Sequence, residues 1–71
     1  MNRFPVNATN IMAIGYDEIN EILEIEFILE VIHHYFNVPL NEFVSLMKAT
    51  CVEEYYFKYV LCKYHFDALD G

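Results

Sequence analysis

The chain has 71 residues, of which 56% are hydrophobic and 17% aromatic, and its formal net charge is −7. A chain this short forms one domain that buries only about 60% of the surface exposed on unfolding, so we expect apolar surface to remain for a partner and the chain to self-associate. No stretch approaches the ~18 to 20 apolar residues that span a bilayer, and two cysteines are too few for a disulfide framework, which predicts a cytoplasmic protein with no membrane partner.

The charged residues are distributed unevenly along the chain. No Lys or Arg lies between Arg3 and Lys48, whereas that interval contains Asp17, Glu18, Glu21, Glu24, Glu26, Glu30 and Glu42. Binding to a phosphate backbone normally needs several Lys or Arg contacts. The layout is typical of a solvated acidic face, and a sharper hypothesis is an acidic surface that docks on a basic protein.

The first two strands follow an irregular lead-in that we predict over residues 1–9. The first strand is expected from Ile11 to Tyr16, with Met12, Ile14 and Tyr16 on one face. The second has the strictest alternation in the chain, Leu23-Glu24-Ile25-Glu26-Phe27. This pattern predicts a half-buried antiparallel strand with its apolar residues in the core and with Glu24 and Glu26 in water.

The third strand is predicted from Val31 to Phe36. The connection Ile28-Leu29-Glu30 contains no turn of the Asn-Gly type, so turn chemistry does not fix the pairing of strands two and three. One register places His34 and Phe36 on the core. A one-residue bulge would instead turn His33 and Tyr35 inward, and the sequence leaves both registers open.

A first helix is predicted after Pro39, which fits a first helical turn, with Asn37 as a nearby cap. Its buried face is expected to follow the i, i+3, i+4, i+7 spacing of Leu40, Phe43, Val44 and Met47. The strands and helices together predict an α+β fold, a three-stranded antiparallel meander followed by two helices packed on one face.

The second helix is predicted from about Val52 to Tyr64, with acidic residues in its first turn and Lys63 in its last. It is apolar nearly all round. One stripe is Val52, Tyr55, Tyr56, Tyr59 and Val60, and the other is Phe57, Leu61 and Tyr64. One stripe can cover the sheet, so the other must meet the first helix, a second subunit or a ligand, and tyrosines suit a wet interface rim.

Site chemistry is sparse. Successive strand residues point to opposite faces, so His33 and His34 cannot ligate one ion, and we predict no metal site and no cofactor. Cys51 and Cys62 would lie roughly 16 Å apart on one helix and are expected as buried free thiols. The chain has no Gly-rich phosphate loop, nucleophile elbow or converging carboxylate pair, so we predict no catalytic residue.

Three segments resemble the KTSC domain: Ile11-Met12-Ala13-Ile14-Gly15-Tyr16-Asp17, Leu23-Glu24-Ile25-Glu26-Phe27 and Tyr35-Phe36-Asn37-Val38-Pro39. The family is a short module found alone in bacteria and at the C-terminus of some lysyl-tRNA synthetases. The resemblance extends over roughly residues 6–64. The Tyr-x-Tyr of the family falls on His33-His34-Tyr35, and family glycines are absent around Glu30 and Val31 and near Cys51. The resemblance carries a suggestion of RNA binding.

We therefore expect a non-enzymatic binding module that acts through protein–protein contacts, with itself or a basic-surfaced protein as partner. One form of this hypothesis is an inhibitor of a basic nucleic-acid-binding protein, encoded by a phage or mobile element. The alternative is RNA or single-stranded nucleic-acid binding by stacking of Tyr16, His33 and Tyr35 on an exposed sheet face. The candidate contact residues are Tyr16, Glu24, Glu26, His33, Tyr35, Tyr55, Tyr59 and Tyr64.

Overall fold

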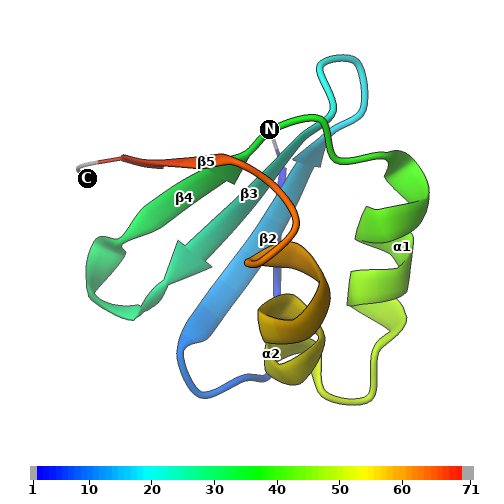
Figure 1. Cartoon of the computed structure of the whole chain (residues 1–71). Helices are drawn as coiled ribbons and strands as arrows, with labels where there is room; N and C mark the ends of the chain where they lie inside the picture. The colour runs from blue at the N-terminus through cyan, green and yellow to red at the C-terminus, as the bar shows by residue number, and fades with distance from the viewer. Residues whose placement is uncertain (1, 70–71) are drawn as a thin grey trace.

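Five antiparallel strands, rather than the three predicted, form one sheet with two helices on one face, an α+β fold (Figure 1). The computed structural model describes residues 2–69. The strands are adjacent in chain order: β1 (Arg3–Pro5), β2 (Ile11–Asp17), β3 (Ile22–Phe27), β4 (Ile32–Tyr35) and β5 (Phe66–Leu69). The helical segments are the short 3₁₀ turn η1 (Ile28–Glu30), α1 (Leu40–Lys48), α2 (Val52–Tyr55) and the π-helical turn η2 (Tyr56–Val60).

The two additional strands are the edges of the sheet. Strand β1 lies in the segment expected to be irregular and pairs with β2, and β5 follows the second helix and pairs with β4. They have three and four residues, too few to show a period of two, and the sequence signal for a strand is that period. Their pairing is instead determined by the edges that β2 and β4 offer.

A bulge near the start of β2 corrects the predicted face of that strand. The pairing between β2 and β3 shifts between Ile11 and Ala13. Ile11 is therefore buried beside Ile14, whereas Met12, expected on the same face as Ile14, is 52% exposed. A bulge of this kind inserts one extra residue and reverses the alternation before it.

The register of β3 and β4 is the one that turns His33 and Tyr35 toward the helices. Ile25 pairs with His33 and Leu23 with Tyr35, and Tyr35 is completely buried. The turn before β4 holds Leu29 and Glu30 at φ 65° and 63°, in the left-handed region that favours glycine. The glycines of the resembling family would fit this turn without steric cost.

Helix α1 begins where predicted, and part of its predicted apolar face packs against the core. Pro39 is its N-cap, and no side chain caps the helix, so Asn37 does not have the expected role. Phe43 and Met47 of the predicted row are partly buried against the core, whereas Leu40 is 43% exposed. Leu46 and Glu42, which were not predicted, are the most buried residues of the helix.

The predicted second helix is shorter and less regular than expected. It continues from α2 into η2, where the backbone N–H of Leu61 donates to the carbonyl of Tyr56, a π-type bond across five residues. Tyr56 and Val60 face the sheet and are buried. The cysteines flank this segment, and both are free thiols that are exposed rather than buried.

The hydrophobic core lies between the sheet and the helices. Its buried members are Ile11, Ile14, Leu23, Ile25, Tyr35, Val38, Leu46, Tyr56 and Val60. The opposite face of the sheet has no covering layer in residues 2–69 (Figure 1). In this described part of the chain no helix combines the length and the apolar character needed to cross a membrane.

Candidate functional site

The helices cover the sheet unevenly, and this exposes aromatic side chains. Helices α1 and α2 lie over the side of β2 and β3, whereas β4 and β5 extend beyond them (Figure 1). The strand pairing places Phe66 beside Tyr35 and Ala68 beside His33 on the helix-facing side. Tyr56 of η2 covers Tyr35, whereas Phe66 at the outer strand is 41% exposed.

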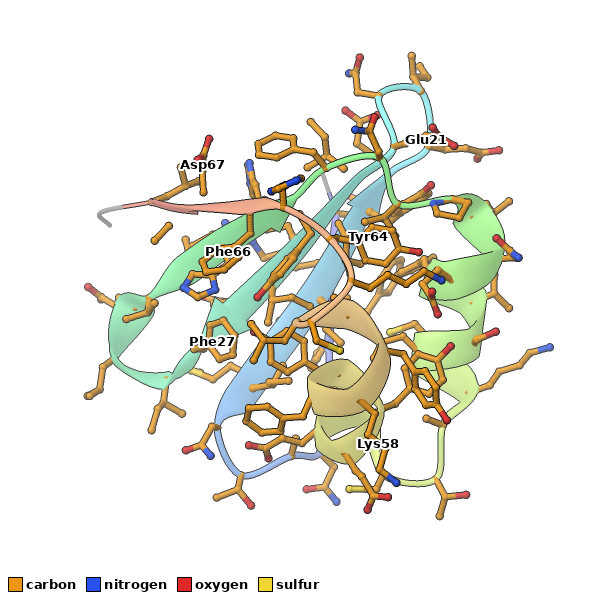
Figure 2. All side chains as sticks on the ribbon, in the orientation of Figure 1. Glu21, Phe27, Lys58, Tyr64, Phe66 and Asp67 are labelled. Atoms are coloured by element: carbon orange, nitrogen blue, oxygen red, sulfur yellow. The ribbon has the colours of Figure 1, made fainter. Side chains whose placement is uncertain are left out.

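Three side chains of the strands and one of η2 form what we call the aromatic surface: Phe27, His33, Phe66 and Phe57. Phe66 stacks on His33 with ring centroids 4.5 Å apart, and Phe27 meets the edge of His33 at 4.8 Å. Tyr56 joins this group to Phe57 at 5.3 Å. Phe57 is 53% and Phe66 41% exposed, and Figure 2 shows Phe27 and Phe66 on the strands beside the second helix. Rings at these distances and angles attract one another, so the surface is internally ordered.

Two buried tyrosines lie beneath the aromatic surface. The hydroxyls of Tyr35 and Tyr56 share a hydrogen bond, and Nδ1 of His33 lies 3.2 Å from the Tyr35 hydroxyl. Burial, followed by the hydrogen bond to Tyr56, raises the pKa of Tyr35 well above its usual range. Burial also lowers the pKa of His33. Both shifts favour the neutral forms, so the surface is uncharged near neutral pH.

The acidic strand residues are not the solvated face that was predicted. On the uncovered side of the sheet, Glu24 is only 5% exposed. It accepts hydrogen bonds from Arg3 on β1 and from Nε2 of His34 on β4, the latter at 2.9 Å. Arg3 also contacts Glu26 at 3.5 Å. Burial opposes ionisation of Glu24, but the hydrogen bonds of His34 and Arg3 outweigh it and lower its pKa.

A second buried carboxylate connects the helices. Glu42 on α1 accepts hydrogen bonds from the hydroxyls of Tyr55 and Tyr64 and from Nζ of Lys63. Burial would raise the pKa of Glu42, but these three donors outweigh burial and lower it. The network connects α1 to Tyr55 of α2 and to Lys63 and Tyr64 after η2, so Tyr55 and Tyr64 have a structural role in the fold.

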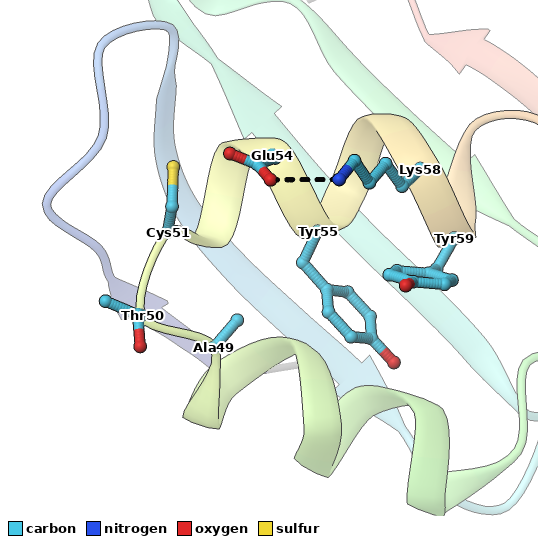
Figure 3. A pocket seen from close by; sticks show the side chains of 7 residues that line it. All are labelled: Ala49, Thr50, Cys51, Glu54, Tyr55, Lys58 and Tyr59. Atoms are coloured by element: carbon cyan, nitrogen blue, oxygen red, sulfur yellow. Dashed lines mark ion pairs between the residues drawn. The ribbon is translucent and has the colours of Figure 1, made fainter.

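A shallow groove lies where α1 meets α2 (Figure 3). It has a volume of about 370 Å³ and is lined by Ala49, Thr50, Cys51, Glu54, Tyr55, Lys58 and Tyr59. Its rim contains the Glu54–Lys58 ion pair at 3.1 Å. Tyr59 packs on Tyr55 at 4.6 Å between ring centroids and is 51% exposed.

The structure thus separates the predicted contact residues instead of gathering them. His33 belongs to the aromatic surface, and Tyr35 lies beneath it. The carboxylates of Glu24 and Glu26 lie on the uncovered face of the sheet. The three predicted tyrosines of the second helical segment belong to the Glu42 network or to the groove. Tyr16 stacks on Phe43 of α1 at 4.9 Å. No exposed platform of Tyr16, His33 and Tyr35 exists in residues 2–69, because Tyr35 is buried and Tyr16 is covered.

Sequence reasoning did not include Phe27, Phe57 and Phe66 among the candidates. Phe57 belongs to the second apolar stripe of the predicted helix, which was expected to need a partner, so a signal was present. Phe66 lies in a strand that has no detectable period. Phe27 was assigned to the core, and it is half-buried at the margin of the core.

The two adjacent histidines of β4 lie on opposite faces of the sheet. His33 faces the helices and His34 the opposite side, as strand geometry predicts. Among residues 2–69, no three His, Cys, Asp or Glu side chains lie close enough to hold a metal ion together.

The fold and the register define a small α+β module with a five-stranded meander and a helical pair, and comparison with known proteins identifies it. Residues 7–64 match the model of the KTSC domain. The chain belongs to the KTSC domain family. It is similar to the crystal structure of a KTSC domain protein from Yersinia pestis, with 28% identity, 97% of each chain covered and a TM-score of 0.92. No curated protein matches the chain.

Proposed function

We propose that this chain is a non-catalytic binding module that acts through protein–protein contacts, with the aromatic surface as its contact surface. The observation that carries the proposal is the exposure of Phe57 and Phe66 at 53% and 41% above an ordered cluster of rings. Aromatic side chains are enriched at protein interfaces, where a few buried rings provide most of the binding energy.

Charge favours a protein partner over a phosphate backbone. Three of the four Lys and Arg residues are engaged with carboxylates: Arg3 with Glu24 and Glu26, and the lysines of the second helical segment with Glu54 and Glu42. Lys48 is the one cation without an ion pair in residues 2–69. Nucleic-acid binding draws its affinity mainly from cations that replace counterions, and this chain offers almost none.

The inhibitor form of the proposal is weakened by the same contacts. An acidic strand face was its basis, but Arg3 forms ion pairs with Glu24 and Glu26, and Glu24 also forms a hydrogen bond with His34. Within residues 2–69, Asp17 at the end of β2 and Glu18 and Glu21 in the turn to β3 form no ion pair. A basic partner is therefore steered by this turn and held by the aromatic surface.

The test compares two exposed aromatic residues of the second helical segment. Phe57→Ser removes a ring of the aromatic surface, and Tyr59→Ser removes one of similar exposure that lies outside it. Affinity capture from the native host, read by mass spectrometry, and sedimentation of the pure chain should both show association that Phe57→Ser weakens and Tyr59→Ser preserves. Equal effects of the two substitutions would refute the proposed contact surface.

RNA binding is the second candidate, and one observation favours it. The stacked rings of His33 and Phe66 could hold an unpaired base, and stacking is worth ~1 to 3 kcal/mol per base. A gel-shift panel with single-stranded RNA at low salt distinguishes the two functions. We expect no shift; binding that falls with salt and is lost on Phe66→Ala would establish RNA as the ligand.

A further inference from the structure

The two edges of the sheet differ in the backbone groups that they present. The N–H of Val6, directly after β1, donates to the carbonyl of Met12 at 3.1 Å. Because backbone directions alternate along an antiparallel ladder, Arg3 and Pro5 direct their backbone groups away from β2. Proline has no N–H, so the edge at β1 lacks one of the donors that a further strand needs.

Strand β5 is the other edge (Figure 1), and its four residues are all exposed. The N–H of Phe36 donates to the carbonyl of His65 at 3.0 Å, so His65 directs its backbone groups toward β4. By the same alternation Asp67 also faces β4, whereas Phe66 and Ala68 direct their N–H and C=O groups outward. These two residues present both donors and both acceptors to an added strand.

The side chains of β5 differ on the two faces of the sheet. Phe66 pairs with Tyr35 and lies on the helix-facing side, where its ring belongs to the aromatic surface. Asp67 pairs with His34 on the uncovered side, and Figure 2 shows Phe66 and Asp67 on opposite sides of the strand. Successive residues of an added strand also alternate between the faces, so one would meet a ring and the next a carboxylate.

Asp67 ends a row of polar side chains that crosses the uncovered face. The register aligns Arg3, Gly15, Glu24, His34 and Asp67 on successive strands. Arg3 and His34 both contact Glu24, but within residues 2–69 Asp67 forms no ion pair. A like charge directly opposite Asp67 would destabilise pairing, and a cation there would stabilise it. The net charge of −7 also attracts a basic partner from a distance.

From these features we infer that the edge at β5 binds an extended segment of a basic protein, which adds a sixth strand with apolar and basic residues in alternation. The apolar residues lie opposite Phe66 and Ala68, exchange backbone hydrogen bonds with them and pack beside the Phe66 ring. The basic residue between them lies opposite Asp67. In such complexes backbone bonds supply affinity and alternate side chains supply specificity. The inference rests on the proposed function, since it names the kind of segment that meets the aromatic surface at Phe66.

The test uses a labelled eight-residue peptide of alternating valine and lysine with blocked ends, titrated into the full chain at low salt and followed by fluorescence anisotropy. Methylation of the valine backbone nitrogens removes the donors that face β5, whereas methylation at the lysines removes those that face solvent. Two lost hydrogen bonds should weaken binding about 30-fold for the first peptide, and the second should bind as the parent does. Both methylated peptides have the same charge and composition, so general attraction to an acidic chain cannot separate them.

Substitutions in the chain locate the peptide at this edge. Ala68→Pro removes an outward N–H, a change that an edge strand tolerates within the fold, and should weaken binding about 5-fold, whereas Ala68→Val should not. Asp67→Asn and Glu54→Gln each remove one exposed carboxylate charge, and only Asp67→Asn should weaken binding, by about 2- to 5-fold. In NMR hydrogen exchange the peptide should protect the amides of Phe66 and Ala68.

Several outcomes would overturn the inference. They are absence of binding at about 1 mM peptide, equal binding of the two methylated peptides, and equal effects of Asp67→Asn and Glu54→Gln, none of which depends on the folding of the proline variant. Self-association of the chain that Ala68→Pro abolishes would instead assign the edge to a second copy. In each case the comparison of Phe57→Ser with Tyr59→Ser still decides the proposed function separately.

Discussion

Removal of the Glu42 charge should destabilise the fold far more than removal of an exposed charge on the neighbouring helix. Glu42 is 9% exposed and accepts hydrogen bonds from two tyrosine hydroxyls and one lysine. Hydrogen bonds to a charged group contribute roughly 1.5 to 3 kcal/mol each, and neutral ones about 1. Glu42→Gln keeps one acceptor oxygen and has no charge, so it removes at least one of the three bonds and weakens the rest.

The expected loss is roughly 2 to 4 kcal/mol of unfolding free energy. For a domain of this size each 1 kcal/mol shifts the melting temperature by about 4 to 8 °C, so the variant should melt at least ~8 °C below the wild type. Glu54→Gln is the matched control, because Glu54 also pairs with a lysine but is exposed and should change the melting temperature little. Both are measured by thermal circular dichroism and urea unfolding.

The pH dependence of this stability difference tests the same reasoning. The pKa of Glu42 is lowered in the folded chain, so its stabilisation is present above the usual glutamate value of about 4.3 and is lost as pH falls through the lower folded value. The difference between wild type and Glu42→Gln should therefore shrink below that pH. Equal melting temperatures of Glu42→Gln and Glu54→Gln at neutral pH would show that the buried network does not stabilise the fold.

Three further predictions concern the turn and the core. Leu29→Gly should raise the melting temperature, because a non-glycine residue at φ 65° costs roughly 1 kcal/mol or more; calorimetry that shows a lower melting temperature would contradict the strained turn. Tyr35→Phe should lower the free energy of unfolding by roughly 1 to 3 kcal/mol, since it leaves the buried Tyr56 hydroxyl without its partner. The control Tyr59→Phe should change this free energy little. Equal urea midpoints of the two variants would be inconsistent with this prediction. The imidazole of His33 should titrate below the usual histidine pKa of about 6.5, which NMR can follow, and stability should fall with pH below that value because the unfolded chain binds the proton first; an unshifted titration would argue against its burial.

The central strands could be predicted from the sequence because their burial follows a simple period. The alternation of β3 correctly placed Leu23 and Ile25 in the core, and the spacing after Pro39 located α1. Glu24 shows where this reasoning fails, because alternation gives the face but not what covers it. Its burial depends on Arg3, which reaches it from a strand 21 residues away in the chain.

The candidate site was harder to predict than the fold for a related reason. The aromatic surface combines Phe27, His33, Phe57 and Phe66 from three strands and a helical turn, so its composition depends on the register of β3 and β4 and on the existence of β5. Neither could be derived from local patterns, since the turn lacks the usual residues and β5 is too short. The tyrosines of the second helix were predicted as contact residues because they are numerous, but most of them form hydrogen bonds within the fold.

The most direct test of the aromatic surface as the contact surface is aromatic NMR of the full chain, recorded from dilute to concentrated solution and on addition of any captured partner. We predict that the largest shift changes occur at Phe27, His33, Phe57 and Phe66, with small changes at Tyr59. Changes that concentrate instead at Tyr55 and Tyr59 in the groove, or at His34 on the uncovered sheet face, would contradict the account.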